Sequence, residues 1–181
     1  MKTFITILFV VMCLAQLAVP GKMIADYERL ARTGTPFRFQ TQPIDPADPF
    51  RGKYITLSFL ADHVRDTSTW SSGEAVNVVF SIDSAGYATV DRLSRDEPNG
   101  PYLHTTITYI DSEDDVHFDL PFDRFYMEET KAKPAEDAYR QANRDSTHTC
   151  YGLIRMGRGR AVITDVLINE QSVTTLIPPN E

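Results

Sequence analysis

The chain has few of the residues that build covalent or metal-based scaffolds. It contains two cysteines, Cys13 and Cys150, in 181 residues. Two thiols are too few for a disulfide framework or a four-thiolate zinc site. Basic residues are also scarce, because 18 Lys and Arg stand against 25 Asp and Glu, a formal net charge of −7. A surface that neutralises nucleic-acid phosphates needs the opposite balance, so we expect no nucleic-acid partner.

Long hydrophobic runs are missing except at the N-terminus. Hydrophobic residues make up 42% and charged residues 24% of the chain, which is ordinary for a globular protein. The exception is residues 4–19, FITILFVVMCLAQLAV, with Lys2 before it and Lys22 after it. As a helix this run is about 24 Å long, slightly short of a hydrocarbon core of about 30 Å. Met23 and Ile24 can extend it, and the two lysines can reach the interface.

Two interpretations of this run remain open, an uncleaved anchor and a cleaved signal peptide. A small-x-small cleavage site is not evident, because Gln16 stands where Ala18 would need a small partner. Residues 13–15, Cys-Leu-Ala, fit that pattern but would place the cut inside the apolar run. We therefore favour an anchor. In either case the rest of the chain is exported and the N-terminus stays inside, although one lysine on each flank gives little charge asymmetry.

An amphipathic pattern follows the apolar run. Apolar side chains recur at helical spacing with charged residues between them, at Met23, Ile24, Tyr27, Leu30 and Ala31. This pattern predicts that the helix leaves the bilayer as a stalk and ends at Gly34. We expect residues 1–34 to form the anchor and stalk, and residues 35–181 to form one exported domain. The protein is expected in the inner, cytoplasmic membrane as a single-pass protein with its C-terminal domain outside the cytoplasm.

Beyond Gly34 the pattern is typical of β-structure. Alternating and β-branched segments bounded by turn residues predict strands over residues 36–41, 54–60, 74–82, 87–93, 102–110, 116–120, 151–156, 161–168 and 172–177. One soluble helix is expected from Lys133 to about Arg144, with Pro134 in its first turn. The predicted fold class is mainly β (α+β), a small β-barrel or sandwich with one helix, preceded by the N-terminal transmembrane and stalk helix.

Residues 43–59 read PIDPADPFRGKYITLSF. This segment resembles the signature of the GDYXXLXY family of membrane-anchored bacterial proteins, whose usual form is PxDPRDPxRGDYVxLxY. Gly52, Tyr54 and Leu57 match, Lys53 replaces the aspartate, and a phenylalanine replaces the final tyrosine. Weaker similarities extend over nearly the whole chain. The resemblance implies a membrane location and this architecture, and it implies no activity.

The proline-rich part of this segment is the strongest candidate for a binding loop. We single out Asp45, Asp48, Arg51, Gly52 and Tyr54 as candidate binding residues. Glycine lets the backbone turn closely as the loop enters the strand. The two aspartates can cap backbone amides, or one of them can pair with the arginine. A structural loop is the favoured hypothesis, and a ligand-binding loop is the alternative.

Side-chain alternation assigns the two faces of the motif strand. Ile55, Leu57 and Phe59 share one face and are expected to fill the core. An aromatic group at residues 122–126 is expected to pack in the core under the helix, or to mark a partner surface if it is exposed.

No group of residues carries a clear catalytic or metal-binding pattern. The histidines, His63, His104, His117 and His148, are dispersed, although strands carrying the middle two can approach across the acidic turn 111–115. We expect no metal site there and a solvated hairpin end rather than a calcium loop.

The candidate nucleophiles also lack their usual surroundings. Ser58, Ser81 and Lys53 belong to no Ser-x-x-Lys or nucleophile-elbow motif, and Cys150 is expected to be a buried packing residue. Three arginines, Arg155, Arg158 and Arg160, surround a glycine turn and are expected to be solvated, with an anionic headgroup or partner as the alternative.

The sequence therefore favours a protein that binds other proteins over an enzyme. We expect a non-enzymatic accessory or interaction module of a membrane assembly, tethered by the N-terminal helix and contacting a membrane-protein partner. The alternative is a periplasmic small-ligand-binding protein or hydrolase with a cleaved signal peptide. No cofactor and no metal are implied.

Overall fold

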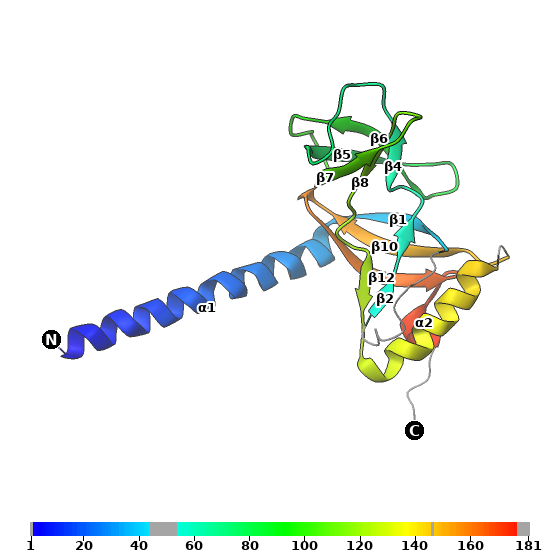
Figure 1. The fold of residues 1–181 in the computed structure, drawn as a ribbon. Coiled ribbons are helices and arrows are strands. Elements are labelled where there is room, and N and C mark those ends of the chain that lie inside the picture. The colour runs from blue at the N-terminus through cyan, green and yellow to red at the C-terminus, as the bar shows by residue number, and fades with distance from the viewer. Residues whose placement is uncertain (1, 44–53, 146, 177–181) are drawn as a thin grey trace.

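A β-rich body carries a long N-terminal helix that projects away from it (Figure 1). The computed structural model describes residues 2–43, 54–145 and 147–176. Its helices are α1 (Lys2–Thr33), α2 (Glu129–Arg144) and α3 (Val173–Leu176). Its strands are β1 (Thr35–Gln42), β2 (Tyr54–Thr56), β3 (Ser58–Phe59), β4 (His63–Arg65), β5 (Ala75–Ile82), β6 (Ala88–Ser94), β7 (Tyr102–Ile110), β8 (Asp115–Phe118), β9 (Arg124–Tyr126), β10 (Cys150–Met156), β11 (Arg158–Gly159), β12 (Ala161–Ile168) and β13 (Gln171–Ser172).

The strands form a near-closed, barrel-like arrangement. One sheet has the order β13-β12-β10-β1-β3, and a second has the order β4-β8-β7-β5-β6 with β11 pairing parallel to β7. A two-stranded sheet pairs β2 with β9. In Figure 1 the β4–β8 region lies at the end of the body opposite α2. The predicted mainly β class is confirmed.

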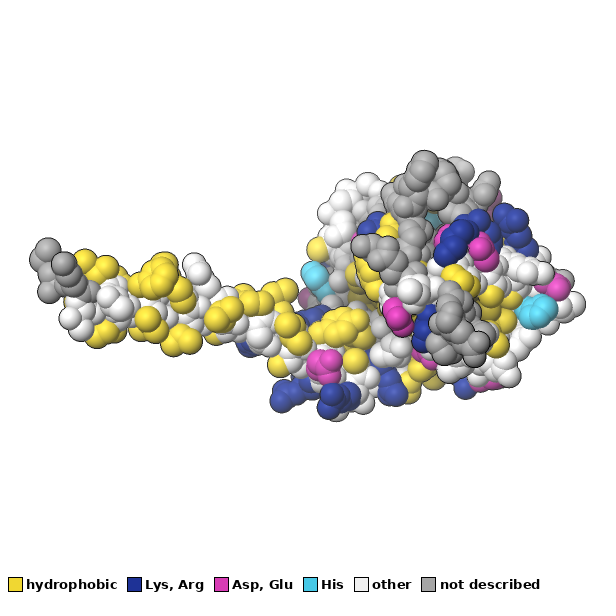
Figure 2. Space-filling model, turned by 90° about the horizontal axis from the view of Figure 1, so that it is seen from below, with side chains coloured by type: hydrophobic (Ala, Val, Ile, Leu, Met, Phe, Trp, Pro, Cys, Tyr) yellow, Lys and Arg dark blue, Asp and Glu magenta, His cyan; other side chains and the backbone are white. Residues whose placement is uncertain are grey.

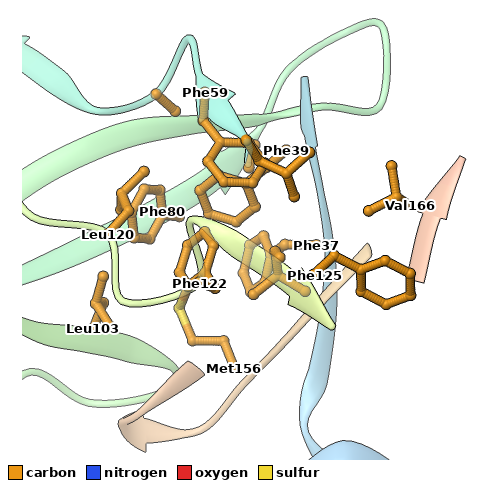
Figure 3. Close-up of a cluster of buried hydrophobic side chains, with 14 of the residues drawn as sticks. Phe37, Phe39, Phe59, Phe80, Leu103, Leu120, Phe122, Phe125, Met156 and Val166 are labelled. Atoms are coloured by element: carbon orange, nitrogen blue, oxygen red, sulfur yellow. The ribbon is translucent and has the colours of Figure 1, made fainter. Parts of the chain in front are cut away.

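An aromatic core joins the two large sheets (Figure 3). Phe39 on β1 is fully buried, and its ring centroid lies 4.9 Å from that of Phe80 on β5. The Phe39 ring also meets Phe59 at 5.8 Å and Phe122 at 5.1 Å, in edge-to-face geometry. Such geometry stabilises aromatic pairs beyond their burial. The sheets are therefore held together by packing between residues far apart in the sequence.

Helix α1 is continuous from the apolar run to the first strand. Pro20 lies inside the helix without ending it. The helix ends at Thr33, where the Gly34 amide donates to the Leu30 carbonyl oxygen at 2.8 Å. Strand β1 begins at the next residue.

Most strand boundaries agree with the sequence expectation to within two residues, and three elements differ more. Helix α2 begins at Glu129 rather than Lys133, because the Glu128 carbonyl oxygen accepts hydrogen bonds from two amides of an earlier turn. The strand expected over 172–177 is limited to β13, which α3 follows directly. The strand expected over 54–60 is interrupted at Leu57, whose amide donates to the Asp123 carbonyl oxygen outside the sheet ladder. Strands β4, β9 and β11 were not expected.

Candidate functional site

The candidate binding loop lies mostly outside the described residues. Asp45, Asp48, Arg51 and Gly52 fall within the segment 44–53, which the structure does not describe. Tyr54, the fifth candidate, begins strand β2 and is half-buried. Of the five candidates, Tyr54 is the one that lies within the described residues.

Tyr54 belongs to an aromatic pair on the two-stranded β2–β9 sheet. It lies opposite Tyr126 in antiparallel register, and the ring centroids are 5.3 Å apart. The Arg124 guanidinium lies 5.3 Å from the centre of the Tyr54 ring, within cation–π range. Tyr126 is 64% exposed, so it lies at the surface and not in the core as expected. This pair fixes the two short strands to each other.

The opposite face of the motif strand enters the core. Ile55, Leu57 and Phe59 are all nearly inaccessible to solvent, as the alternation predicted. The Phe59 ring packs against Phe122 at 5.3 Å, and Phe125 is also buried. The described part of the family motif thus has a structural task, because its alternate side chains close one end of the core.

A small polar network lies between the motif strand and α2. The Thr41 hydroxyl is shared between the Asn143 Oδ1 and the Cys150 carbonyl oxygen, each 3.1 Å away. Asn143 Nδ2 in turn donates to the Tyr139 hydroxyl at 3.2 Å. Burial raises the pKa of Tyr139 far above its usual range. The neighbouring cavity, lined by Thr56, Tyr139 and Asn143 among others, has a volume of about 20 Å³.

That volume is about the size of one water molecule. In addition, no buried side-chain nitrogen or oxygen within residues 2–43, 54–145 and 147–176 lacks a hydrogen-bond partner. The described cavity beside the motif is therefore large enough for one water molecule, and the buried polar side chains around it have hydrogen-bond partners.

Among the candidate nucleophilic residues, Lys53 lies outside the described residues, whereas Ser58, Ser81 and Cys150 are described. Gln42 Nε2 donates to the Ser58 hydroxyl at 2.8 Å, and the Ser81 hydroxyl lies 3.1 Å from that of Thr89. Cys150 is buried, as expected, and burial raises the pKa of its thiol to about 11. None of these contacts is with a basic group that could activate a nucleophile.

The end of α1 is docked on the body. Gly34 and Gly157 lie against Leu30: a Cβ atom at position 157 would stand 2.9 Å from the Leu30 Cδ1. The Arg155 guanidinium crosses from β10 and donates to the Gly34 carbonyl oxygen at 3.1 Å. The helix therefore meets the body through close packing and a hydrogen bond, and its direction relative to the strands is fixed at this point.

Basic side chains collect around this junction. Figure 2 shows Lys and Arg side chains where α1 meets the body. Asp26 on α1 pairs with Lys22 at 2.7 Å and lies 3.8 Å from Arg160. Arg29 and Arg158 line an adjacent shallow groove of about 250 Å³. Arg158 and Arg160 are thus brought beside the helix that the sequence assigns to the membrane.

A histidine pair within the described residues is a grouping of titratable side chains that sequence reasoning missed. His117 lies opposite His63 across β4 and β8, and Asp62 adjoins them. His104, the expected neighbour of His117, instead hydrogen-bonds Asn77 at 2.8 Å. No sequence signal connected residues 63 and 117, because β4 is a strand of three residues within a polar segment.

The fold and the junction define a class: a near-closed β body on one N-terminal helix that is long and apolar enough to cross a membrane. The family model described as GDYXXLXY protein matches residues 16–166, so the chain belongs to the GDYXXLXY family. No curated protein and no solved structure matches the chain. The suspected family is confirmed.

Proposed function

We propose that this protein is a single-pass protein of the inner, cytoplasmic membrane whose β body acts outside the cytoplasm as a non-enzymatic interaction module of a membrane assembly. Helix α1 stays in the bilayer uncleaved, with its N-terminus in the cytoplasm. The observation that carries the proposal is the continuity of α1. Its apolar segment is not buried inside the protein, and the same helix continues without a break to the last turn, which packs on the body.

Exposure of the stalk supports an uncleaved helix. Met23, Ile24 and Tyr27 lie past the apolar run and are 67%, 64% and 56% exposed. A mature protein cut near residue 18 would leave these apolar groups uncovered in water, at a cost of about 25 cal/mol per Å² of apolar surface. In an anchored protein they lie at the bilayer interface, where tyrosine is favoured.

The dimensions of α1 set the height of the body above the bilayer. The stretch from Phe4 to Lys22 is about 27 Å long at ~1.5 Å per residue, which matches a hydrocarbon core of ~30 Å. Asp26 lies about 6 Å further along the helix, within the headgroup layer. Because Arg160 lies 3.8 Å from Asp26, the turn between β11 and β12 rests at headgroup level. The junction would then hold the body against the membrane surface in one orientation.

The accessory role is supported by the surroundings of the hydroxyls and the thiol. Ser58 and Ser81 bond to an amide and to another hydroxyl, and the Cys150 thiol is buried. In this proposal the body contributes a surface rather than a reaction, and its partner is another membrane protein reached at the bilayer.

The anchor is tested by the mass and location of the mature chain. We expect the full-length protein, carrying a C-terminal tag, to stay in carbonate-washed membranes with its first residues retained, and a C-terminal alkaline phosphatase fusion to be active. The variant Gln16→Ala creates the small-x-small sequence Ala-Leu-Ala at residues 16–18 and should be cleaved and released in part. Gln16→Leu is the matched control and should remain intact. A wild-type chain that starts near residue 16 or 19 and is soluble would end the proposal.

The interaction role has a separate test. A photo-crosslinking residue at the exposed position Tyr126 should capture the same membrane protein in repeated experiments from intact cells. The same group placed at buried Ile55 is the control for non-specific labelling. If neither Tyr126 nor the exposed Ile82 captures a recurring membrane protein, the body is not an interaction module.

A further inference from the structure

The histidine pair lies on two neighbouring strands of the sheet farthest from α2 (Figure 1). His63 on β4 and His117 on β8 are directly opposite each other in antiparallel register. Their ring centroids are 4.9 Å apart and the ring planes differ by 23°. Asp62 precedes His63, and its Oδ1 lies 2.7 Å from His63 Nδ1. One donor atom from each of the three residues lies within 4.8 Å of the other two.

The backbone around the pair is fixed by the sheet. Val64 pairs with the fully buried Val116 beside the histidines. On the other side, the Phe118 amide donates to the Asp62 carbonyl oxygen at 3.1 Å. Directly opposed residues hold their Cβ atoms about 4.5–5.5 Å apart, which lets both imidazoles reach a common point. The strands therefore hold the two rings close together without help from a ligand.

Neighbouring side chains orient the donors and supply negative charge. The Tyr109 ring stacks on His117 with a centroid distance of 4.1 Å and an interplanar angle of 12°. Gln42 Nε2 donates to Asp62 Oδ2 at 3.4 Å. Asp111 Oδ2 lies 3.8 Å from His117 Nε2. Two carboxylates thus flank two imidazoles, a combination that favours a dication and fixes ligand orientation.

We propose that Asp62, His63 and His117 bind a divalent transition-metal ion, with zinc as the representative. Two imidazole nitrogens and one carboxylate oxygen suit Zn²⁺, Cu²⁺ or Ni²⁺, whereas Mg²⁺ and Ca²⁺ prefer sites made of oxygen donors. Donor atoms that share a tetrahedral zinc ion are about 3.3 Å apart, given bonds of ~2.0 Å. The donor atoms now lie within 4.8 Å of one another, so metal binding requires His63 and Asp62, whose side chains are 42% and 32% exposed, to turn toward a common point with His117.

The site is partly open to solvent, which leaves room for a further ligand on the ion. Three protein donors leave a fourth position facing solvent, for water or for a donor from another molecule. The ion also ties β4 to β8, which otherwise pair through three residues each. This site is independent of the membrane proposal, since none of its residues lies near the junction of α1.

The test is a titration of the full-length protein in mild detergent, purified without a histidine tag and stripped with a chelator. Isothermal titration calorimetry with ZnCl₂ should show one site, and MgCl₂ at the same concentration should show none. His63→Gln and His117→Gln should each weaken zinc binding at least about 10-fold. His148→Gln is the matched control, because that histidine also adjoins an aspartate, with its Nδ1 3.4 Å from Asp145 Oδ2. Its zinc affinity should equal that of the wild type.

A second measurement uses the unaltered protein, so it does not depend on the folding of any variant. Zinc should protect His63 and His117 from diethylpyrocarbonate, read by mass spectrometry, and leave His148 as reactive as before. Zinc binding that survives the double variant His63→Gln/His117→Gln would overturn the proposal. Equal protection of His148, or no zinc binding by the wild type, would overturn it as well.

Discussion

Leu30 of α1 and Gly34 at the start of the body form the tightest contact of the junction: a Cβ atom at position 34 would lie 2.7 Å from the Leu30 carbonyl oxygen. The obstacle is backbone, so it cannot move aside as a side chain can. The Gly34 amide also donates to that same oxygen at 2.8 Å. The orientation of α1 relative to the body therefore depends on a glycine at position 34.

We expect Gly34→Ala to loosen the junction. The added methyl group must displace the last turn of α1, at a cost of about 1–3 kcal/mol for an overpacked site. The measurement is the rate of tryptic cleavage after Arg32 in detergent, which should rise, together with a lower thermal unfolding temperature. Gly21→Ala is the matched control, because a Cβ there meets nothing within 4 Å and alanine favours a helix. An unchanged cleavage rate in Gly34→Ala would show that the helix is not docked as described.

The aromatic core makes a second prediction. Phe39 is fully buried and contacts Phe59, Phe80 and Phe122, so Phe39→Ala leaves a cavity between the sheets. We expect a loss of about 3–5 kcal/mol in the free energy of unfolding, measured by denaturant titration. Ile82→Ala, at a position 58% exposed, should change it by no more than about 0.5 kcal/mol. Similar losses in both variants would contradict the packing.

The strands could be predicted from the sequence because their side chains alternate between two environments. Ile55, Leu57 and Phe59 show this well, since their spacing alone assigned them to the core. The end of α1 was also predictable, because Gly34 interrupts a helical pattern. Local signals of this kind need no knowledge of the rest of the fold.

Features set by distant pairing could not be predicted. The contact between His63 and His117 depends on the register of β4 against β8, and β4 is only three residues long, too short for its pattern to predict a strand. Pro134 marked the expected start of α2, yet the helix begins a turn earlier, because Glu128 accepts two backbone hydrogen bonds. In both cases a tertiary or backbone contact outweighs the local pattern.

The family motif makes a third prediction about Tyr54. If its task is structural, its interaction with Tyr126, at a ring distance of 5.3 Å, should contribute to stability. A double-mutant cycle with Tyr54→Ala and Tyr126→Ala should give a coupling energy of about 0.5–1.5 kcal/mol. Tyr54→Phe should retain most of it, since the ring and not the hydroxyl makes the contact. A coupling near zero would mean that the β2–β9 sheet does not depend on this pair.

Alkaline pH provides the last prediction, through the buried thiol of Cys150. Burial raises its pKa to about 11 from a usual value of 9.0. Between these values the unfolded chain loses the thiol proton while the folded chain keeps it, so the free energy of unfolding falls as pH rises through this window. Below pH 9 the stabilising contribution of the thiol is complete. The free energy of unfolding changes in the same direction through Tyr151, because burial and the hydrogen bond with Glu170 raise the pKa of Tyr151 to about 12.

Denaturant midpoints at pH 8, 9.5 and 10.5 should therefore decrease in order, and Cys150→Ala should flatten the first part of that decrease. An identical pH dependence in the wild type and in Cys150→Ala would show that the thiol is not shielded in the folded protein.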